Sequence, residues 1–327
     1  MFRLQSLRAP MLTTAAVAIT AFSAAAWAAD AAWKPDRPVT LVVPYAPGGG
    51  TDAQARAVAR ELQRIWGQPL IVINAAGADG MIGTRKVIES KADGYTLLVQ
   101  LPSLTLIKHL PSFKGVDPVT QLVPVSAFSS LPGVVVANAI VPGRTMAELV
   151  RNCRAAARPC SLGTTENIAR LQARVLVEEN NLPNLIVANY RGGGPLLNDL
   201  MANNVNTAIM GITAVLPHTK SGALKVIMTL GHKRSSVLPE VPSATEAGFP
   251  SFDMGTWYGI FAPKDTPAAV VQGVAVAVQE AVRTEGARKT FDTIGADALG
   301  NTPAEFAAMV KVDNDRYDTL AKRFPIE

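Results

Sequence analysis

The chain has 327 residues, of which 48% are hydrophobic and 17% are charged, and its formal net charge is +5. This composition predicts a globular protein with a large core, and the length favours two lobes because one compact core rarely grows so large. The weak positive charge, without a cluster of basic residues interleaved with aromatic ones, argues against a nucleic-acid-binding protein.

The N-terminal segment predicts export. Arg3 and Arg8 are the only charged residues before Asp30, and they precede an apolar, alanine-rich run over residues 11–26. Ala26-Trp27-Ala28 then places small residues at both positions that a signal peptidase inspects. We therefore interpret residues 1–28 as a signal peptide cleaved near Ala28. No later stretch approaches the ~20 apolar residues of a membrane span, which predicts a soluble mature chain.

The first glycine-rich loop joins a predicted strand to a predicted helix. Residues 39–43 are β-branched and apolar, residues 53–66 carry apolar side chains at helical spacing, and Tyr45-Ala-Pro-Gly-Gly-Gly-Thr-Asp52 lies between them. Thr51 or Asp52 is placed to cap the helix. Unpaired N–H groups at a helix start attract anions, and glycine lets a ligand approach the backbone. A tight turn without a ligand is the alternative, since the run matches neither a P-loop nor a dinucleotide motif.

The same strand, loop and helix pattern recurs along the chain. Further strands are predicted at residues 70–73, 95–99, 134–136, 185–188, 205–210 and 224–230. Helices are predicted at 84–90, at 145–157 and over the helical pattern of 267–321, where Thr302 caps the last helix and Pro303 occupies its first turn. Loops rich in glycine or polar residues follow strands at 74–83, 100–103 and 190–195.

This alternation predicts an α/β fold with mainly parallel sheets, whose ligands bind at the carboxyl ends of the strands. The loops lie at those ends in both halves of the chain. A hinged binding protein and an enzyme would share this arrangement.

Cys153 and Cys160 are the only cysteines. In an oxidising compartment, a pair this close predicts a disulfide that joins a helix end to the next strand. A redox or metal-binding pair is the alternative, but it would need a Cys-x-x-Cys spacing or two further ligands.

The sequence contains no recognisable catalytic motif. His109, His218 and His232 are the only histidines, and none has metal-ligand spacing. A Gly-x-Ser-x-Gly nucleophile elbow is also missing, and no two carboxylates can be nominated as acid and base. We therefore expect no catalytic residue, metal or cofactor. A periplasmic hydrolase or isomerase and a pure interaction protein remain as alternatives.

Several motifs together give the chain its resemblance to a known family. They are Pro38-Val-Thr-Leu-Val-Val-Pro-Tyr-Ala-Pro-Gly-Gly-Gly-Thr-Asp52, Gly67-Gln-Pro69, Gly77-x-x-Gly-x-Ile-Gly83, Asp93-Gly-Tyr-Thr-Leu97, Tyr190-Arg-Gly192, Leu216-Pro-His218, Leu238-Pro-Glu-Val-Pro242, Glu246-Ala-Gly248 and Trp257-Tyr-Gly259. In this order and spacing they resemble the Bug family, the periplasmic solute receptors of tripartite tricarboxylate transporters. The resemblance covers essentially the whole mature chain.

The resemblance implies a two-lobed, Venus-flytrap α/β protein in the periplasm that closes on a small organic carboxylate without chemistry. It also implies two crossings between lobes, which we place near residues 132–140 and 250–255. Lobe 1 would then contain residues 29–135 and 254–327, and lobe 2 residues 136–253. The implied partners are a small organic anion and the permease subunits in the inner membrane, and we expect a monomer.

The predicted ligand-binding residues come from loops of both lobes. They are Tyr45, Ala46, Pro47, Gly48, Gly49, Gly50, Asp52, Gln100 and Ser103 in lobe 1, and Thr164, Thr165, Asn167, Arg170 and Met210 in lobe 2. The first loop would bind one ligand carboxylate through backbone N–H groups. Arg170 would either grip a second carboxylate or face solvent.

The chain departs from the family pattern in lobe 2. Residues 164–170 replace a serine-rich loop that ends in histidine, and Met210 stands near a position where members often carry aspartate. We therefore predict an anionic ligand without an ammonium group, since a desolvated ammonium needs a negative partner. Asp52, Asp79 and Glu166 lie in or beside the loops and could supply that partner from another direction.

Overall fold

The computed structural model describes residues 33–48, 50–111, 113–165, 167–190, 193–231 and 233–324. The predicted signal peptide, residues 1–28, lies outside them. In the segments described, no helix combines the length and the apolar composition needed to cross a membrane.

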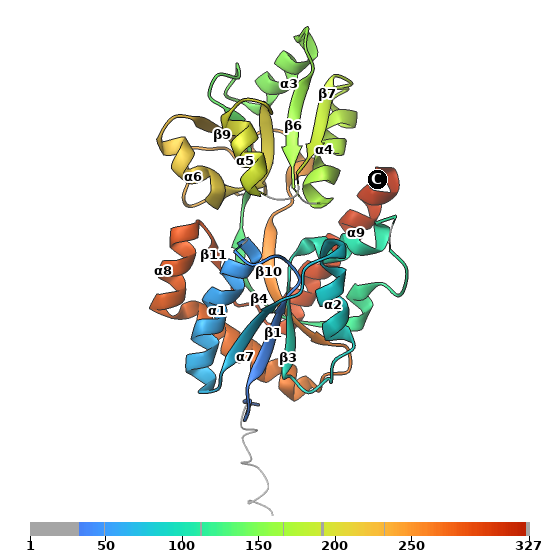
Figure 1. Cartoon of the computed structure of the whole chain (residues 1–327), viewed down its shortest axis with the longest axis vertical. Coiled ribbons are helices and arrows are strands. Elements are labelled where there is room, and N and C mark those ends of the chain that lie inside the picture. The colour runs from blue at the N-terminus through green and yellow to red at the C-terminus, as the bar shows by residue number, and fades with distance from the viewer. Residues whose placement is uncertain are drawn as a thin grey trace, which may run out of the picture. The chain divides into compact units, whose positions relative to one another are not determined.

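The first sheet contains six of the described strands and begins with the predicted strand that precedes the glycine loop (Figure 1). Its spatial order is β11, β4, β10, β3, β1, β2. The bounds are β1 Val39–Val43, β2 Leu70–Asn74, β3 Thr96–Gln100, β4 Leu122–Leu131, β10 Thr256–Pro263 and β11 Asp297–Ala298.

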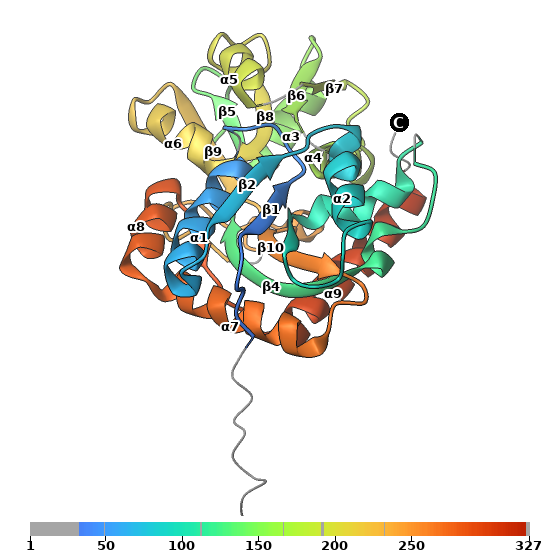
Figure 2. The ribbon, with the colours of Figure 1, turned by 60° about the horizontal axis from the view of Figure 1, so that its bottom comes forward.

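Helices cover both faces of this sheet (Figure 2). They are α1 Gly50–Trp66, α2 Met81–Ile88, α7 Ala268–Arg283, α8 Glu285–Ile294 and α9 Pro303–Arg323. Neighbouring residues of one strand point to opposite faces. Leu41 accordingly packs in the core with α1 and α7, while Val42 packs in the core with α2 and α9. Most residues of the central strands β1, β3 and β10 are therefore apolar and buried, as expected for a sheet covered on both sides.

The second sheet contains five strands in the described ranges, in the order β7, β6, β8, β5, β9. The bounds are β5 Gly133–Asn138, β6 Cys160–Thr164, β7 Leu185–Asn189, β8 Thr207–Gly211 and β9 Leu224–Thr229. The helices on this sheet are α3 Met146–Ala155, α4 Asn167–Glu179, α5 Gly193–Met201 and α6 Ile212–Lys220.

The two-sheet α/β organisation is confirmed, with one correction: the sheets are mixed rather than mainly parallel. In the first sheet β10 runs antiparallel to both β3 and β4, and in the second β5 runs antiparallel to both β8 and β9. The strands joined through helices, such as β1 to β2 and β6 to β7, pair in parallel.

The antiparallel direction of β5 and β10 follows from how the chain enters each sheet. Each strand arrives from the other sheet at the edge where the parallel strands end: Gly133 at the start of β5 pairs with Gly211 at the end of β8, and Thr256 at the start of β10 pairs with Leu131 at the end of β4. Both crossings therefore lie at the carboxyl ends of the strands, where ligands bind in open α/β sheets.

The crossings fall at short segments. Pro132 alone separates β4 from β5, and residues 253–255 separate the 3-10 turn Pro250–Phe252 from β10. All of β5 pairs within the second sheet, so the lobe boundary that we placed after residue 135 moves to Pro132.

The C-terminal helical pattern forms α7, α8 and α9, with the two-residue strand β11 before α9. The predicted cap of α9 is confirmed, because Thr302 accepts from the Glu305 N–H while Glu305 accepts from the Thr302 N–H. The predicted disulfide between Cys153 in α3 and Cys160 in β6 is also confirmed, and its Cα atoms lie 5.7 Å apart.

Candidate functional site

The loop after β1 is fixed by side chains of the first sheet. The Tyr45 hydroxyl lies 3.1 Å from Gln100 Oε1 and 2.8 Å from Ser103 Oγ. Gln100 is fully buried, and its Nε2 donates to Thr84 Oγ1 at 3.0 Å. Gln100 thus positions Tyr45, while the neighbouring Ala46, Pro47 and Gly48 are exposed at the surface of the loop.

Asp52 is the centre of a second hydrogen-bonded group. Its Oδ2 accepts from the Gly48 N–H and from Arg56 Nε, both at 3.0 Å, and its Oδ1 accepts from Asn74 Nδ2 at 3.0 Å. The same Asn74 nitrogen donates to the Tyr45 carbonyl at 3.0 Å. Burial acts to raise the pKa of Asp52, but the hydrogen bonds from Arg56, Gly48 and Asn74 outweigh it and leave this pKa below its ordinary value. A charged carboxylate therefore organises the loop.

This geometry corrects one expectation about the loop and restricts a second, which stays a prediction. Helix α1 begins at Gly50, so Thr51 and Asp52 lie inside its first turn rather than at the cap. The Gly48 N–H already donates to Asp52, so a ligand carboxylate would use other N–H groups. Gly49 lies outside the described residues.

The loop between β6 and α4 supplies the residues of the second sheet. Thr164 ends β6, and its hydroxyl donates to Asn189 Oδ1 at 2.8 Å. Thr165 is half-buried and Asn167 begins α4. Arg170 is half-buried and interacts with other residues of the chain.

Two buried polar atoms of α4 have no hydrogen-bond partner among the described residues. They are Oδ1 of Asn167, whose residue is 5% exposed, and Nε2 of Gln172, whose residue is 1% exposed. Leaving such a group unpaired costs about 1–3 kcal/mol. Native structures rarely keep this cost without a role for the group, so the two atoms indicate partners such as a ligand or ordered water.

A cavity of about 70 Å³ lies where the carboxyl ends of the two sheets meet. It is lined by Leu131, Gly133, Thr165, Ile168, Ala169, Gln172, Ile209, Met210, Gly211, Leu230, Met254, Thr256 and Tyr258. Two predicted residues, Thr165 and Met210, are therefore brought together here. The predicted residues of the first sheet do not line the cavity. Of these, Gly50 comes near Tyr258 in the cavity wall, whose hydroxyl lies 3.7 Å from where a Cβ on Gly50 would be.

Contacts between the two lobes hold this cavity small. On one side, Ile168 and Leu171 of α4 share an apolar cluster with Leu106 and with Tyr317 of α9. On another, the Thr213 hydroxyl of α6 donates to the Ile294 carbonyl of α8. The cavity has room for a few water molecules, so a ligand of several carbons requires these contacts to loosen.

No group of three or more histidine, cysteine, aspartate or glutamate side chains that could hold a metal ion is present in the part of the chain that the structure describes.

The chain matches a known receptor family over most of its length. Residues 54–324 match the family described as "Tripartite tricarboxylate transporter family receptor". Protein BugT of Bordetella pertussis (strain Tohama I) is 34% identical over 292 residues, which cover 86% of this chain and 88% of BugT. The chain belongs to this receptor family.

Solved structures agree with the assignment. The periplasmic binding protein BugD has a TM-score of 0.77 at 30% identity, and the match covers 90% of this chain and 99% of BugD. R. palustris Rpa4515, solved with adipate, has a TM-score of 0.78 at 27% identity, over 88% of this chain and 97% of Rpa4515. The matched family is a receptor family and BugD is a periplasmic binding protein, so the chain belongs with receptors rather than with enzymes.

Sequence reasoning missed three polar residues that line the cavity: Gln172, Thr256 and Tyr258. Gln172 had a usable signal, because it falls on the helical face of Ile168 and Ala169 and is a polar residue in an otherwise apolar stripe. Tyr258 belongs to the Trp257-Tyr-Gly259 motif, to which we had assigned no role. Thr256 had no usable sequence signal, because it reaches the cavity only through the second crossing between the two sheets.

Proposed function

We propose that this family member is a periplasmic receptor for a small organic carboxylate without an ammonium group. It hands this ligand to the permease of a tripartite tricarboxylate transporter in the inner membrane. Residues 1–28 act as the export signal, and the mature protein works as a monomer. Relatives solved with adipate and with malate support a dicarboxylate as the ligand class.

The main support for the proposal is the buried amide of Gln172 at the cavity between the sheets. Gln172 lines this cavity, and its Nε2 has no partner among the described residues. An N–H donor is what a carboxylate oxygen requires, and a hydrogen bond to a charged group contributes about 1.5–3 kcal/mol. The ligand thereby satisfies a group that is costly to leave unpaired.

The carboxylate at the other end of the ligand is assigned to the glycine-rich loop of residues 45–52. Exposed residues 46–48 and Gly50 at the start of α1 leave backbone accessible beside Tyr258. A helix start favours a negative charge through its N–H groups and dipole. Asn167 and Arg170 add further polar contacts from the second sheet.

The exclusion of an ammonium group rests on Met210 and on Asp52. Met210 lines the cavity with an apolar side chain. The Asp52 carboxylate is already committed to Gly48, Arg56 and Asn74, so it is a poor partner for a ligand ammonium. A desolvated ammonium without a carboxylate partner costs several kcal/mol.

Isothermal titration calorimetry with adipate, malate, glutarate and glutamate tests the proposal. We expect at least one dicarboxylate to bind, and glutarate to bind at least ten times more tightly than glutamate, which differs from it by an ammonium group. A ligand at 100 times its dissociation constant should add about 2.7 kcal/mol to the free energy of unfolding, which a thermal shift reports. Tighter binding of glutamate would refute the ammonium exclusion. Turnover of an ester or amide without carboxylate binding would refute the receptor.

A further inference from the structure

A second, larger cavity lies within the second lobe, beside the disulfide. Its volume is about 380 Å³, and it lies between α3 and strands β5, β6 and β8. Its apolar wall includes Val135, Met146, Leu149, Val150 and Leu162. Ile209 is shared with the smaller cavity between the sheets, but the two cavities have different methionines, Met146 here and Met210 and Met254 there.

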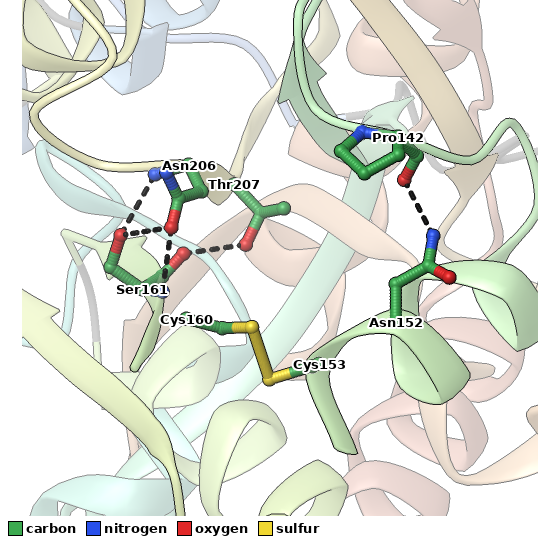
Figure 3. Close-up of a disulfide and its surroundings, with 7 residues drawn as sticks. All are labelled: Pro142, Asn152, Cys153, Cys160, Ser161, Asn206 and Thr207. Atoms are coloured by element: carbon green, nitrogen blue, oxygen red, sulfur yellow. Dashed lines mark hydrogen bonds between the residues drawn. A yellow bond between two sulfur atoms is a disulfide. The ribbon is translucent and has the colours of Figure 1, made fainter. Parts of the chain in front are cut away.

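The side chains of Asn152, Asn206 and Thr207 at this cavity are already hydrogen-bonded (Figure 3). Asn206 Oδ1 accepts from the Ser161 N–H at 3.2 Å and the Ser161 hydroxyl at 3.1 Å, and the Thr207 hydroxyl donates to the Ser161 carbonyl at 2.8 Å. Asn152 Nδ2 donates to the Pro142 carbonyl at 2.9 Å. A cavity whose polar groups are paired holds water weakly and favours an apolar guest.

Helix α3 is tied to its surroundings at both ends, which keeps it above the sheet. Thr145 and Glu148 form a capping box at its start. Cys153 near its end forms a disulfide with Cys160 of β6, and Asn152 donates a hydrogen bond to the Pro142 carbonyl. These bonds fix both ends of α3 beside the cavity.

The rim of the cavity carries one exposed cation. Arg158 lines it and is exposed, and no hydrogen bond or ion pair engages Arg158 within the described ranges. The exposed Ile140, at 73%, and Pro159 flank the rim with apolar surface. An apolar interior with a cation at its edge matches an amphiphilic anion.

We propose that this cavity is a second ligand site, which takes a monoanion with an apolar body such as an aromatic ring. The ring lies among the aliphatic side chains beneath α3, and the carboxylate lies at Arg158. A cavity of about 150 Å³ in another protein is enough to bind benzene, so this space accommodates a larger ring system. The site is separate from the carboxylate cleft of the proposed function and does not depend on it.

The test uses 1-naphthoate as the probe and two methionine methyl groups as reporters. In ¹³C-methyl-methionine spectra of the purified protein, 1-naphthoate is expected to shift the Met146 signal saturably and to leave the Met210 signal in place. Met146→Leu and Met210→Leu assign the two signals. A shift of Met210 without Met146, or no saturable shift up to the solubility limit of the probe, would overturn the proposal.

Calorimetry of substituted proteins measures how each side chain contributes to 1-naphthoate affinity. Val150→Phe fills the cavity and should weaken 1-naphthoate binding at least tenfold, while Val276→Phe on the exposed face of α7 should leave it unchanged. Arg158→Ala should weaken binding about threefold, as expected for an exposed charge, and Arg151→Ala on α3 should not. Unchanged affinity in a folded Val150→Phe protein would overturn the proposal. If that variant does not fold, the Met146 signal of the wild type decides.

Discussion

The two sides of the cleft differ in how their polar side chains are paired. On the first sheet, Tyr45 is hydrogen-bonded to Gln100, Gln100 to Thr84 and Asp52 to Gly48, so hydrogen bonds within the chain organise the loop. On the second sheet, the buried Asn167 and Gln172 each keep an unpaired polar atom within the described structure. Under the proposed function, the first side is preformed, and the unpaired polar atoms of the opposing side gain partners when the ligand binds.

The largest expected effect comes from breaking the preformed side at Asp52. Asp52→Ala leaves the Gly48 N–H, Arg56 and Asn74 without their acceptor, and Asp52 itself is only 4% exposed. Because Arg56 is partly exposed, we expect a loss of about 2–3 kcal/mol in the free energy of unfolding, and a large loss of ligand affinity. Urea denaturation measures the first and calorimetry the second.

The matched control for Asp52 is Asp315→Ala, which removes an exposed ion pair with Lys311 and should cost less than about 0.5 kcal/mol. Equal stability of the two variants would show that the loop is not organised by Asp52.

Gln172→Met tests the opposite side and should separate binding from stability. The substitution keeps the length of the side chain but removes the unpaired donor. We expect dicarboxylate affinity to fall 10–100-fold while the free energy of unfolding stays the same or rises. Gln272→Met on the exposed face of α7 is the control and should change neither quantity. A clear loss of stability in Gln172→Met would mean that the amide has a structural partner in the ligand-free protein.

Tyr45→Phe should produce a smaller effect on the preformed side. It removes the hydroxyl that contacts Gln100 and Ser103, which costs about 1 kcal/mol of stability. Tyr317→Phe is the informative control, because the buried Tyr317 hydroxyl has no hydrogen-bond partner among the described residues. Its removal should be neutral or stabilising. Thermal denaturation of both variants measures the difference, and an equal loss in both would contradict the assigned role of Tyr45.

The pH dependence of stability is expected to show the smallest effect. It tests the same difference between the two sides of the cavity. The pKa of Asp52 is lowered in the folded protein, so its contribution is complete above roughly pH 5 and is lost as the pH falls through the unfolded and then the folded pKa. The difference in unfolding free energy between wild type and Asp52→Asn should therefore shrink from pH 6 toward pH 3. A difference that stays constant over this range would show that Asp52 is not stabilised in its charged form.

Much of the fold could be predicted from the sequence because its signals are local. The periodicity of β1 and α1, the Thr302 cap and the spacing of Cys153 and Cys160 each depend on residues within a few turns of one another. The antiparallel direction of β5 and β10 could not be predicted in this way, since it depends on the path of the chain between the two sheets.

The candidate site shows the same difference between local signals and features that depend on the path of the chain. The sequence pointed to Thr165, which lines the cavity, because polar residues after strands are local signals, while Tyr45, predicted in the same way, does not line it. The sequence pattern assigned no role to Tyr258, which comes near Gly50 only through the second crossing between the sheets. It also could not reveal that Asp52 accepts a hydrogen bond from the Gly48 N–H.

We propose above that a carboxylate without an ammonium group binds at the cavity between the two sheets. The most direct measurement is a titration of ¹³C-methyl-methionine protein with glutarate and, separately, with glutamate, read at Met210 in the cavity wall. We expect a saturable shift of the Met210 signal with glutarate at concentrations at least tenfold below those that glutamate requires, and an unchanged Met146 signal. A Met210 signal that responds to neither compound nor to adipate or malate, or that responds to glutamate first, would contradict it.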